Sequence, residues 1–232
     1  RLPYPLIICW LVVSIVCLIL ITLFFTRKRN KQVIQYMIVF MATLIWWQVT
    51  YVLELLSADL ANKLFWCDIQ FFGLFSMPFV WLMAILAYCN REKAISIVRT
   101  AWMIFLGFTV LVILTNDVFH LFHVNPSMVI EDGIAIVDFD YGRWFYMVFL
   151  PTTFGLFLAS VVILINQTKK VTEQLYKKQI YTLIAVVILN LIASTFYNLG
   201  IYIVNGIENI SITLPVTSLI VFIALRRLKL FN

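Results

Sequence analysis

Charged residues are scarce in this sequence: they make up 12% of the 232 residues, whereas hydrophobic residues make up 63%. A soluble domain contains roughly 25% charged and roughly 45–50% apolar residues. A soluble fold of this size could not bury so much Leu, Ile, Val and Phe, so lipid must cover much of the surface. The composition therefore excludes an ordinary soluble domain and predicts an integral membrane protein.

Residue types that build catalytic and metal sites are also few. The two histidines have no carboxylates at ligand spacing, and no nucleophile and base stand in a recognisable pattern. The four cysteines lie in apolar stretches and form no C-x-x-C pair. We interpret them as small buried hydrophobic residues, with a disulfide between Cys9 and Cys67 as the alternative. We expect no enzyme activity in this segment, no cofactor and no metal ion.

Seven apolar stretches suggest membrane-spanning helices, since a helix needs about 20 residues to cross the hydrocarbon layer. The first stretch ends in a basic cluster, so we interpret it as a resident helix and not as a signal peptide. The last stretch is short and contains Pro215. The expected spans are residues 5–26, 33–56, 64–88, 96–115, 144–168, 179–203 and 210–225. The predicted fold is an all-α bundle of seven transmembrane helices forming a single domain, residues 1–232.

The basic residues lie in alternate breaks between these spans. The first, third and fifth breaks, the segment after the last span and Arg99 at the start of the fourth span together account for 14 of the 17 Lys and Arg residues, with only two acids. Lys and Arg stay on the cytoplasmic side during insertion, so the N-terminus is expected outside and the C-terminus inside. Topology thus explains the net charge of +6, and we expect no nucleic-acid partner. The predicted location is the plasma membrane, in the lipid bilayer, with several passes.

The one long connection on the outer side runs from Asn116 to Arg143. Within it, residues 128–139 predict two short strands around a Glu131-Asp132-Gly133 turn. We expect a small β-hairpin between the fourth and fifth helices, lying over the outer mouth of the bundle; an irregular loop is the alternative. The sequence shows no internal repeat, which argues against an inverted-repeat transporter.

Polar side chains at membrane depth are costly and usually face the interior of a bundle. In the second span, Trp47, Tyr51 and Glu54 share one helix face, and Gln48 lies beside them. This face is expected either to line a pocket or to form an interfacial carboxylate with an aromatic belt.

The third span carries a second stripe at helical spacing. Trp66 and Gln70 share this stripe with Gly73, where another backbone or a ligand can approach closely. Asp68 points elsewhere, and Gln70 lies deep enough to need a hydrogen-bond partner. Packing between helices explains the stripe as well as ligand binding does.

Most of the remaining polar groups fall in the outer half of the expected bundle, whereas the inner half is nearly all aliphatic and aromatic. This asymmetry predicts an outward-facing polar cavity that does not continue through the membrane. His120 also fits a histidine at a helix end. The candidate ligand-binding residues are Trp47, Gln48, Tyr51, Glu54, Trp66, Asp68, Gln70, Asn116, His120, Arg143, Trp144, Tyr197 and Asn198.

Several patches in order along the chain carry a family resemblance. They are Leu53-Glu54, Lys63 to Gly73, Pro78-Phe-Val-Trp81, Leu114-Thr-Asn116 with His120, Tyr141-Gly-Arg-Trp144, Asn198-Leu-Gly200, Thr213-Leu-Pro215 and Arg226-Arg-Leu228. With these patches the chain resembles the N-terminal seven-transmembrane sensor region of prokaryotic histidine kinases. One departure is that Ser211 and Ile212 stand where the family pattern has an acid, which puts an acid-dependent role there in doubt.

The resemblance implies a bacterial two-component signalling receptor that dimerises through a histidine kinase following the last helix. We therefore expect a sensor that binds a small extracellular or membrane-borne ligand and relays the signal to a cytoplasmic output. A membrane transporter or channel subunit is the alternative. A retinal photoreceptor would need a Schiff-base lysine in residues 210–225, where there is none. A G-protein-coupled receptor would need an acidic-arginine-aromatic triplet at the inner end of the third span, which is missing.

Overall fold

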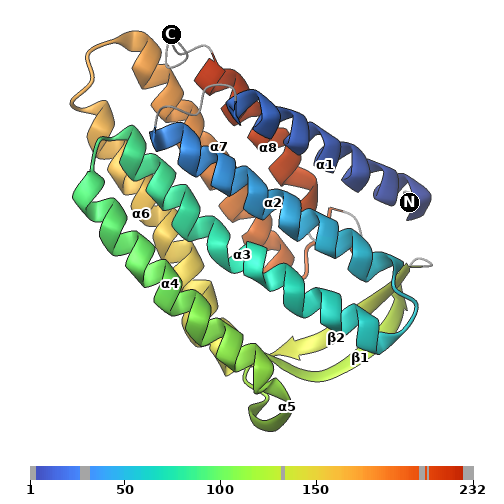
Figure 1. The fold of residues 1–232 in the computed structure, drawn as a ribbon. Helices are drawn as coiled ribbons and strands as arrows, with labels where there is room; N and C mark the ends of the chain where they lie inside the picture. The colour runs from blue at the N-terminus through green and yellow to red at the C-terminus, as the bar shows by residue number, and fades with distance from the viewer. Residues whose placement is uncertain (1–3, 27–31, 132–133, 204–206, 208, 227–232) are drawn as a thin grey trace.

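The computed structural model describes residues 4–26, 32–131, 134–203, 207 and 209–226. Within this part the chain forms a bundle of seven long helices with a two-stranded sheet at one end (Figure 1). The long helices are α1 (Tyr4–Thr26), α2 (Gln32–Leu56), α3 (Leu60–Tyr88), α4 (Glu92–Leu114), α6 (Leu150–Thr168), α7 (Gln174–Asn198) and α8 (Asn209–Arg226). A single turn, α5 (Asn116–Phe119), follows α4, and a π-helical turn, η1 (Phe145–Phe149), leads into α6. We call the end with the sheet the hairpin end.

Six of the helices are long and apolar enough to cross a membrane, namely α1, α2, α3, α4, α7 and the continuous helix of η1 and α6. The apolar part of α8, Asn209–Ala224, is shorter, so the seventh span stays a prediction. The sixth expected span, 179–203, is displaced toward the N-terminus. It ends at Asn198 because Gly200 takes a left-handed conformation with φ of 75°, which terminates helices. Helix α7 starts earlier than the expected span because a helix can include lysines, whereas a search for apolar stretches leaves them out.

Helix α3 lies at the centre of the bundle. In its most apolar window of 18 residues, 83% of the residues are buried, against 11% for α4. Its closest neighbour is α2, and a Cβ atom added to Gly73 would lie 2.8 Å from the Thr43 carbonyl oxygen. The Trp46 indole also donates to the Ile69 carbonyl across this contact, at 3.0 Å. The expected close approach at Gly73 is therefore confirmed, and its partner is the backbone of α2.

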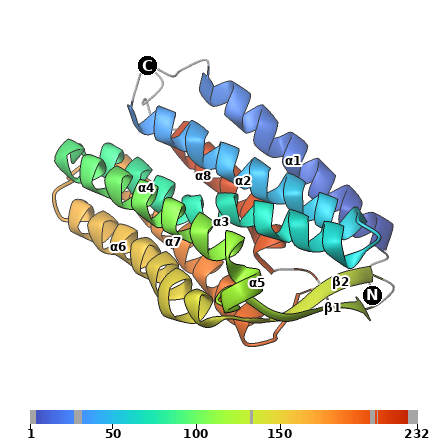
Figure 2. The same cartoon turned by 60° about the horizontal axis from the view of Figure 1, so that its bottom comes forward.

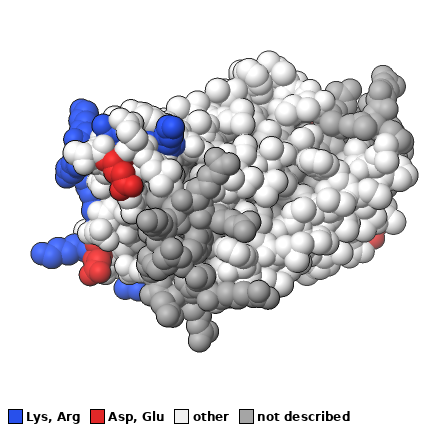
Figure 3. Space-filling view, turned by 90° about the horizontal axis from the view of Figure 1, so that it is seen from above, with Lys and Arg blue, Asp and Glu red and all other residues white. Residues whose placement is uncertain are grey.

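The surface of the bundle is apolar along its length and charged at one end. Large side chains of α4 such as Ile97, Ile104 and Leu111 are more than half exposed, as expected for contact with lipid. Lys and Arg side chains gather at the end opposite the hairpin, and a broad uncharged surface follows (Figure 3). Arg91, Lys93 and the loop after α6 contribute to this basic end.

The sheet at the hairpin end consists of antiparallel strands β1 (His123–Glu131) and β2 (Ile134–Tyr141). The expected hairpin is confirmed, and it is longer than residues 128–139 because pairing continues to His123 and Tyr141. A bulge between Val124 and Ser127 interrupts the register. The predicted turn at residues 132–133 lies outside the described residues. Strand β2 contacts α2 and α3, so the hairpin lies across one end of the bundle (Figure 2).

All four cysteines are thiols in the structure. Cys9 is exposed on α1, and Cys67 is buried in α3. The alternative of a Cys9–Cys67 disulfide is therefore wrong, and Cys67 fits the interpretation as a small buried hydrophobic residue.

Candidate functional site

A cavity of about 580 Å³ lies between the hairpin and the helix ends beneath it, and we call it the hairpin cavity. Five parts of the chain meet there: α2, α3, the hairpin, the start of the η1–α6 helix, and the end of α7 with the residues after it. Its lining residues are Tyr51, Glu54, Leu55, Cys67, Gln70, Phe71, Val129, Ile136, Val137, Asp138, Phe139, Tyr141, Tyr146, Leu150, Tyr197, Asn198, Gly200 and Tyr202. The volume falls in the range of small-molecule sites, roughly 300–1,000 Å³.

Glu54 of α2 and Gln70 of α3 form the buried polar pair of this cavity. Their exposed fractions are 6% and 4%, and the Gln70 amide Nε2 donates to Glu54 Oε2 at 2.7 Å. The two side chains meet because Gly73, three residues after Gln70, brings α3 against α2. The other amide atom, Gln70 Oε1, is buried and accepts no hydrogen bond. A buried acceptor without a donor is uncommon and calls for an explanation.

Lys63 lies next to this pair, although it does not line the cavity. Its side chain is fully buried, and its ammonium donates to the carbonyls of Glu54 and Leu55 at 2.8 and 3.3 Å. These are among the last carbonyls of α2, which have no partner within their helix. Lys63 thus stabilises the end of α2. Sequence reasoning missed this role, although a lone Lys on the acid-rich side of the membrane was a usable signal.

Aromatic rings form much of the remaining wall. Tyr51 stacks against Trp47 with ring centroids 6.2 Å apart, and Tyr141 stacks against Phe145 at 3.6 Å. Trp47 is fully buried behind Tyr51 and does not line the cavity. Seven of the eighteen lining residues are aromatic. The cavity therefore offers apolar faces around one buried polar pair.

A second polar cluster anchors the hairpin beside the cavity. His123 Nε2 lies 2.9 Å from Asp68 Oδ1, which joins β1 to α3. Asn116 accepts the backbone N–H groups of Phe122 and His123 at 2.8 and 3.2 Å and donates to the His123 carbonyl at 3.0 Å. Asp68 and Asn116, both predicted as ligand residues, are used for attachment here. Of the two histidines, the buried one is His123, whereas the predicted His120 is exposed at the end of α5.

Of the thirteen predicted residues, the structure brings five together around the cavity: Tyr51, Glu54, Gln70, Tyr197 and Asn198. Four others sit away from it. Trp66 packs against Phe65, and Trp144 against Phe105 and Phe108. Gln48 faces α1 and α8, and Arg143 is exposed.

The hairpin strands supply lining residues that sequence reasoning missed. Val129, Ile136 and Phe139 carry apolar side chains, so a search for costly polar groups could not find them. The predicted position of the hairpin over the outer mouth of the bundle was the available signal. No three His, Cys, Asp or Glu side chains within the described ranges converge as a metal site would require.

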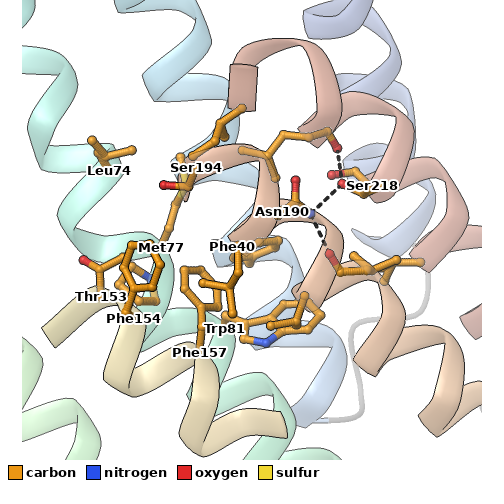
Figure 4. Close-up of a pocket in the computed structure, with 18 of the residues that line it drawn as sticks. Phe40, Leu74, Met77, Trp81, Thr153, Phe154, Phe157, Asn190, Ser194 and Ser218 are labelled. Atoms are coloured by element: carbon orange, nitrogen blue, oxygen red, sulfur yellow. Dashed lines mark hydrogen bonds between the residues drawn. The ribbon is translucent and has the colours of Figure 1, made fainter. Parts of the chain in front are cut away.

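A second, smaller cavity of about 80 Å³ lies in the middle of the bundle, and we call it the mid-bundle cavity (Figure 4). It shares no lining residue with the hairpin cavity. Most of its wall is apolar, including Phe40, Met77 and Trp81. Its polar edge is formed by Asn190 of α7, which donates to Thr217 of α8 at 3.0 Å.

Comparison with known proteins gives one family match. The family model described as the N-terminal 7TM region of histidine kinase matches residues 10–232, nearly the whole chain. No curated protein matches the chain.

Proposed function

The chain belongs to the family of N-terminal seven-transmembrane regions of histidine kinases, and from this premise we propose that it is a sensor whose ligand binds in the hairpin cavity. One observation carries the proposal: Gln70, which lines a cavity of small-molecule size, has a buried acceptor, Oε1, with no donor. A polar atom that the fold leaves unsatisfied in such a place is explained when a ligand satisfies it.

We further propose the orientation. The basic end is cytoplasmic, because Lys and Arg are retained on that side. The hairpin end then faces outward, α8 is the seventh span, and the C-terminus is inside. In this arrangement a ligand reaches the hairpin cavity from outside the plasma membrane, and α8 leads toward a cytoplasmic kinase.

The route from the cavity to α8 runs through Gln48 of α2. Gln48 accepts a hydrogen bond from Ser14 of α1 at 3.1 Å and donates to the Ser211 carbonyl of α8 at 3.4 Å. It lies on the same helix as Tyr51 and Glu54, so a displacement of α2 by ligand would change these contacts. The shift in the bundle is limited by the difference in ligand affinity between its two states.

Cys67 makes a test possible before any ligand is known, because this thiol lines the hairpin cavity. A variant keeps Cys67 and replaces Cys9, Cys17 and Cys89 by Ala. In lipid nanodiscs it is treated with benzyl methanethiosulfonate, an uncharged thiol reagent that leaves a benzyl group in the cavity. Hydrogen exchange of the α8 amides is then compared with and without the label. We expect the label to change exchange along α8.

The matched control keeps only Cys9, which is exposed on α1 at the same end of the bundle. The same label there should leave α8 exchange unchanged. In sealed vesicles Cys67 should react from the hairpin side alone. Failure of Cys67 to react, or labelling without any change in α8, would contradict the sensor proposal. Reaction from both sides together with solute flux would favour the transporter alternative.

A further inference from the structure

We propose that the hairpin cavity binds a small organic amine in its protonated form, with the ammonium at the Glu54–Gln70 pair and the apolar body against the aromatic wall. This inference rests on the proposed function, since it names the chemical class of the ligand at that site.

The charges of the lining point to a cation. Two of the described lining residues are acidic, the buried Glu54 and the exposed Asp138. None of the described lining residues is Lys, Arg or His. A buried carboxylate is costly unless a cation or hydrogen-bond donors accompany it. An anionic ligand would meet repulsion from Glu54, whereas a cationic ligand would be attracted.

The hydrogen-bonding pattern narrows the cation to one with N–H donors. Gln70 uses one N–H of its amide Nε2 on Glu54 Oε2, and its Oε1 is a buried acceptor without a donor. The carboxylate accepts only. The pair therefore has more acceptor positions than donors, and Gln70 Oε1 is left without a donor. A primary or secondary ammonium can donate to both residues, whereas a quaternary ammonium has no N–H to offer.

The fold contains an internal cation, Lys63, which interacts electrostatically with Glu54 but leaves one acceptor of the pair without a donor. Its ammonium is bound to the main-chain carbonyls of Glu54 and Leu55, and Gln70 Oε1 still has no donor. His123, the other basic side chain near the cavity, lies against Asp68 and does not line it.

The walls suit the organic part of the ligand. Tyr51, Phe71, Phe139, Tyr141 and Tyr146 are among the aromatic lining residues. Aromatic faces attract cations within about 6 Å of the ring centre and also pack against apolar groups. A bare metal ion would instead need several converging carboxylate, imidazole or thiolate ligands, and the described residues offer no such group.

The first test uses charged thiol reagents on the variant that keeps only Cys67. Aminoethyl methanethiosulfonate carries an ammonium, and sulfonatoethyl methanethiosulfonate carries a sulfonate. Each rate is divided by the rate of the same reagent with a free thiol in solution. We expect the cation to modify Cys67 about tenfold faster than the anion, because Glu54 concentrates cations in the cavity.

The preference should depend on Glu54 and not on acids elsewhere at the hairpin end. Glu54→Gln keeps the size and an acceptor for Gln70, so it should abolish most of the preference. The matched control is Asp140→Asn, an exposed acid of β2 that does not line the cavity, and it should leave the preference intact.

The second test needs no variant. Phenylethylamine, phenylethanol and phenylpropanoate are titrated into the wild-type chain in nanodiscs, with protection of Cys67 from benzyl methanethiosulfonate as the readout. We expect protection by the amine at concentrations about tenfold lower than for the alcohol, and none by the carboxylate.

The outcomes separate this inference from the proposed function. If the uncharged reagent reaches Cys67 and changes α8, but the anion reacts as fast as the cation or the carboxylate protects as well as the amine, the amine inference is wrong and the sensor stands. If the uncharged reagent cannot reach Cys67 at all, both proposals fall together.

Discussion

The hairpin cavity and the mid-bundle cavity share helices α2, α3, α6 and α7 but use polar groups differently. In the mid-bundle cavity, Asn190 bonds to Thr217 at 3.0 Å and accepts from Thr213 at 3.0 Å, so its amide is spent on joining α7 to α8. In the hairpin cavity, Gln70 uses only half of its amide on Glu54. The cavity whose polar amide is satisfied is also the smaller one, with a volume of about 80 Å³ against about 580 Å³ for the hairpin cavity. Polar residues within a membrane protein thus indicate a binding site only where bonds between helices leave them unsatisfied.

The largest effect on stability is expected from a substitution at Gly73, because both cavities depend on the contact between α2 and α3 at this residue. In Gly73→Val the new Cβ would lie 2.8 Å from the Thr43 carbonyl oxygen, so α2 and α3 must separate. We expect a loss of about 3 kcal/mol of stability from this overpacking. Thermal unfolding of the purified variant in nanodiscs measures it, and both cavities should lose their shape together.

Gly107 of α4 provides the control, because a Cβ there meets no atom within 4 Å. Gly107→Ala should leave the unfolding temperature equal or raise it, since Ala favours a helix more than Gly does. Equal effects of the Gly73 and Gly107 substitutions would contradict the close approach of α2 and α3.

A smaller effect on stability is expected from a substitution at Asn190. This substitution should affect the mid-bundle cavity without affecting the hairpin cavity. Asn190→Leu removes the hydrogen bonds to Thr217 and Thr213 and should cost about 1 kcal/mol, as interhelical hydrogen bonds in membranes do. Faster hydrogen exchange in α8 would report it. The ratio between the rates at which the cationic and the anionic reagent modify Cys67 should not change. Thr182→Val serves as the control, because the Thr182 hydroxyl donates to the Lys178 carbonyl of its own helix.

Ser218 tests whether every unsatisfied oxygen marks a site. Its buried hydroxyl lines the mid-bundle cavity and has no hydrogen-bond partner, like Gln70 Oε1. Ser218→Ala removes this polar atom and should leave the protein equally stable or up to about 1 kcal/mol more stable. Binding in the hairpin cavity should be unaffected, whereas Gln70→Leu should weaken amine binding. A loss of amine binding in Ser218→Ala would break the distinction between the cavities.

The smallest effect is expected from the start of α3, outside the membrane-spanning segments. Asp59 accepts from the backbone N–H of Asn62 at 2.9 Å and from its side-chain amide at 2.6 Å, and these bonds lower the pKa of Asp59 from its usual 3.8. Because the folded-state pKa is depressed, the carboxylate stabilises the fold above pH 3.8, and this contribution is lost as the pH falls through the folded-state pKa.

Asp59→Ala should therefore lower the unfolding temperature at neutral pH by a small amount. The difference from the wild type should shrink when both are measured in acid, below the folded-state pKa of Asp59. A difference that persists unchanged in acid would show that the ionised side chain is not the cause.

The hydrophobic runs and the placement of Lys and Arg predicted the helices closely, because lipid permits only long apolar helices and insertion retains basic residues on one side. The bounds failed where helices continue beyond the lipid, as α7 does through Lys177 and Lys178. The hairpin was predictable from its alternation, although its strands are longer than predicted because pairing resumes beyond the bulge and continues to His123 and Tyr141.

The sequence by itself indicated which side chains are costly in lipid and are expected to face inward, including Gln48, Glu54 and Gln70. Only the tertiary structure decided what each of them contacts, because an inward-facing amide can bond to a neighbouring helix or remain open to a cavity. The packing of α2 on α3 and of the hairpin on both directed Gln48 to α1 and α8, Asn116 to the hairpin, and Gln70 in part to the cavity wall. Such contacts join residues far apart in the chain, so the periodic pattern of residues within one segment cannot predict them.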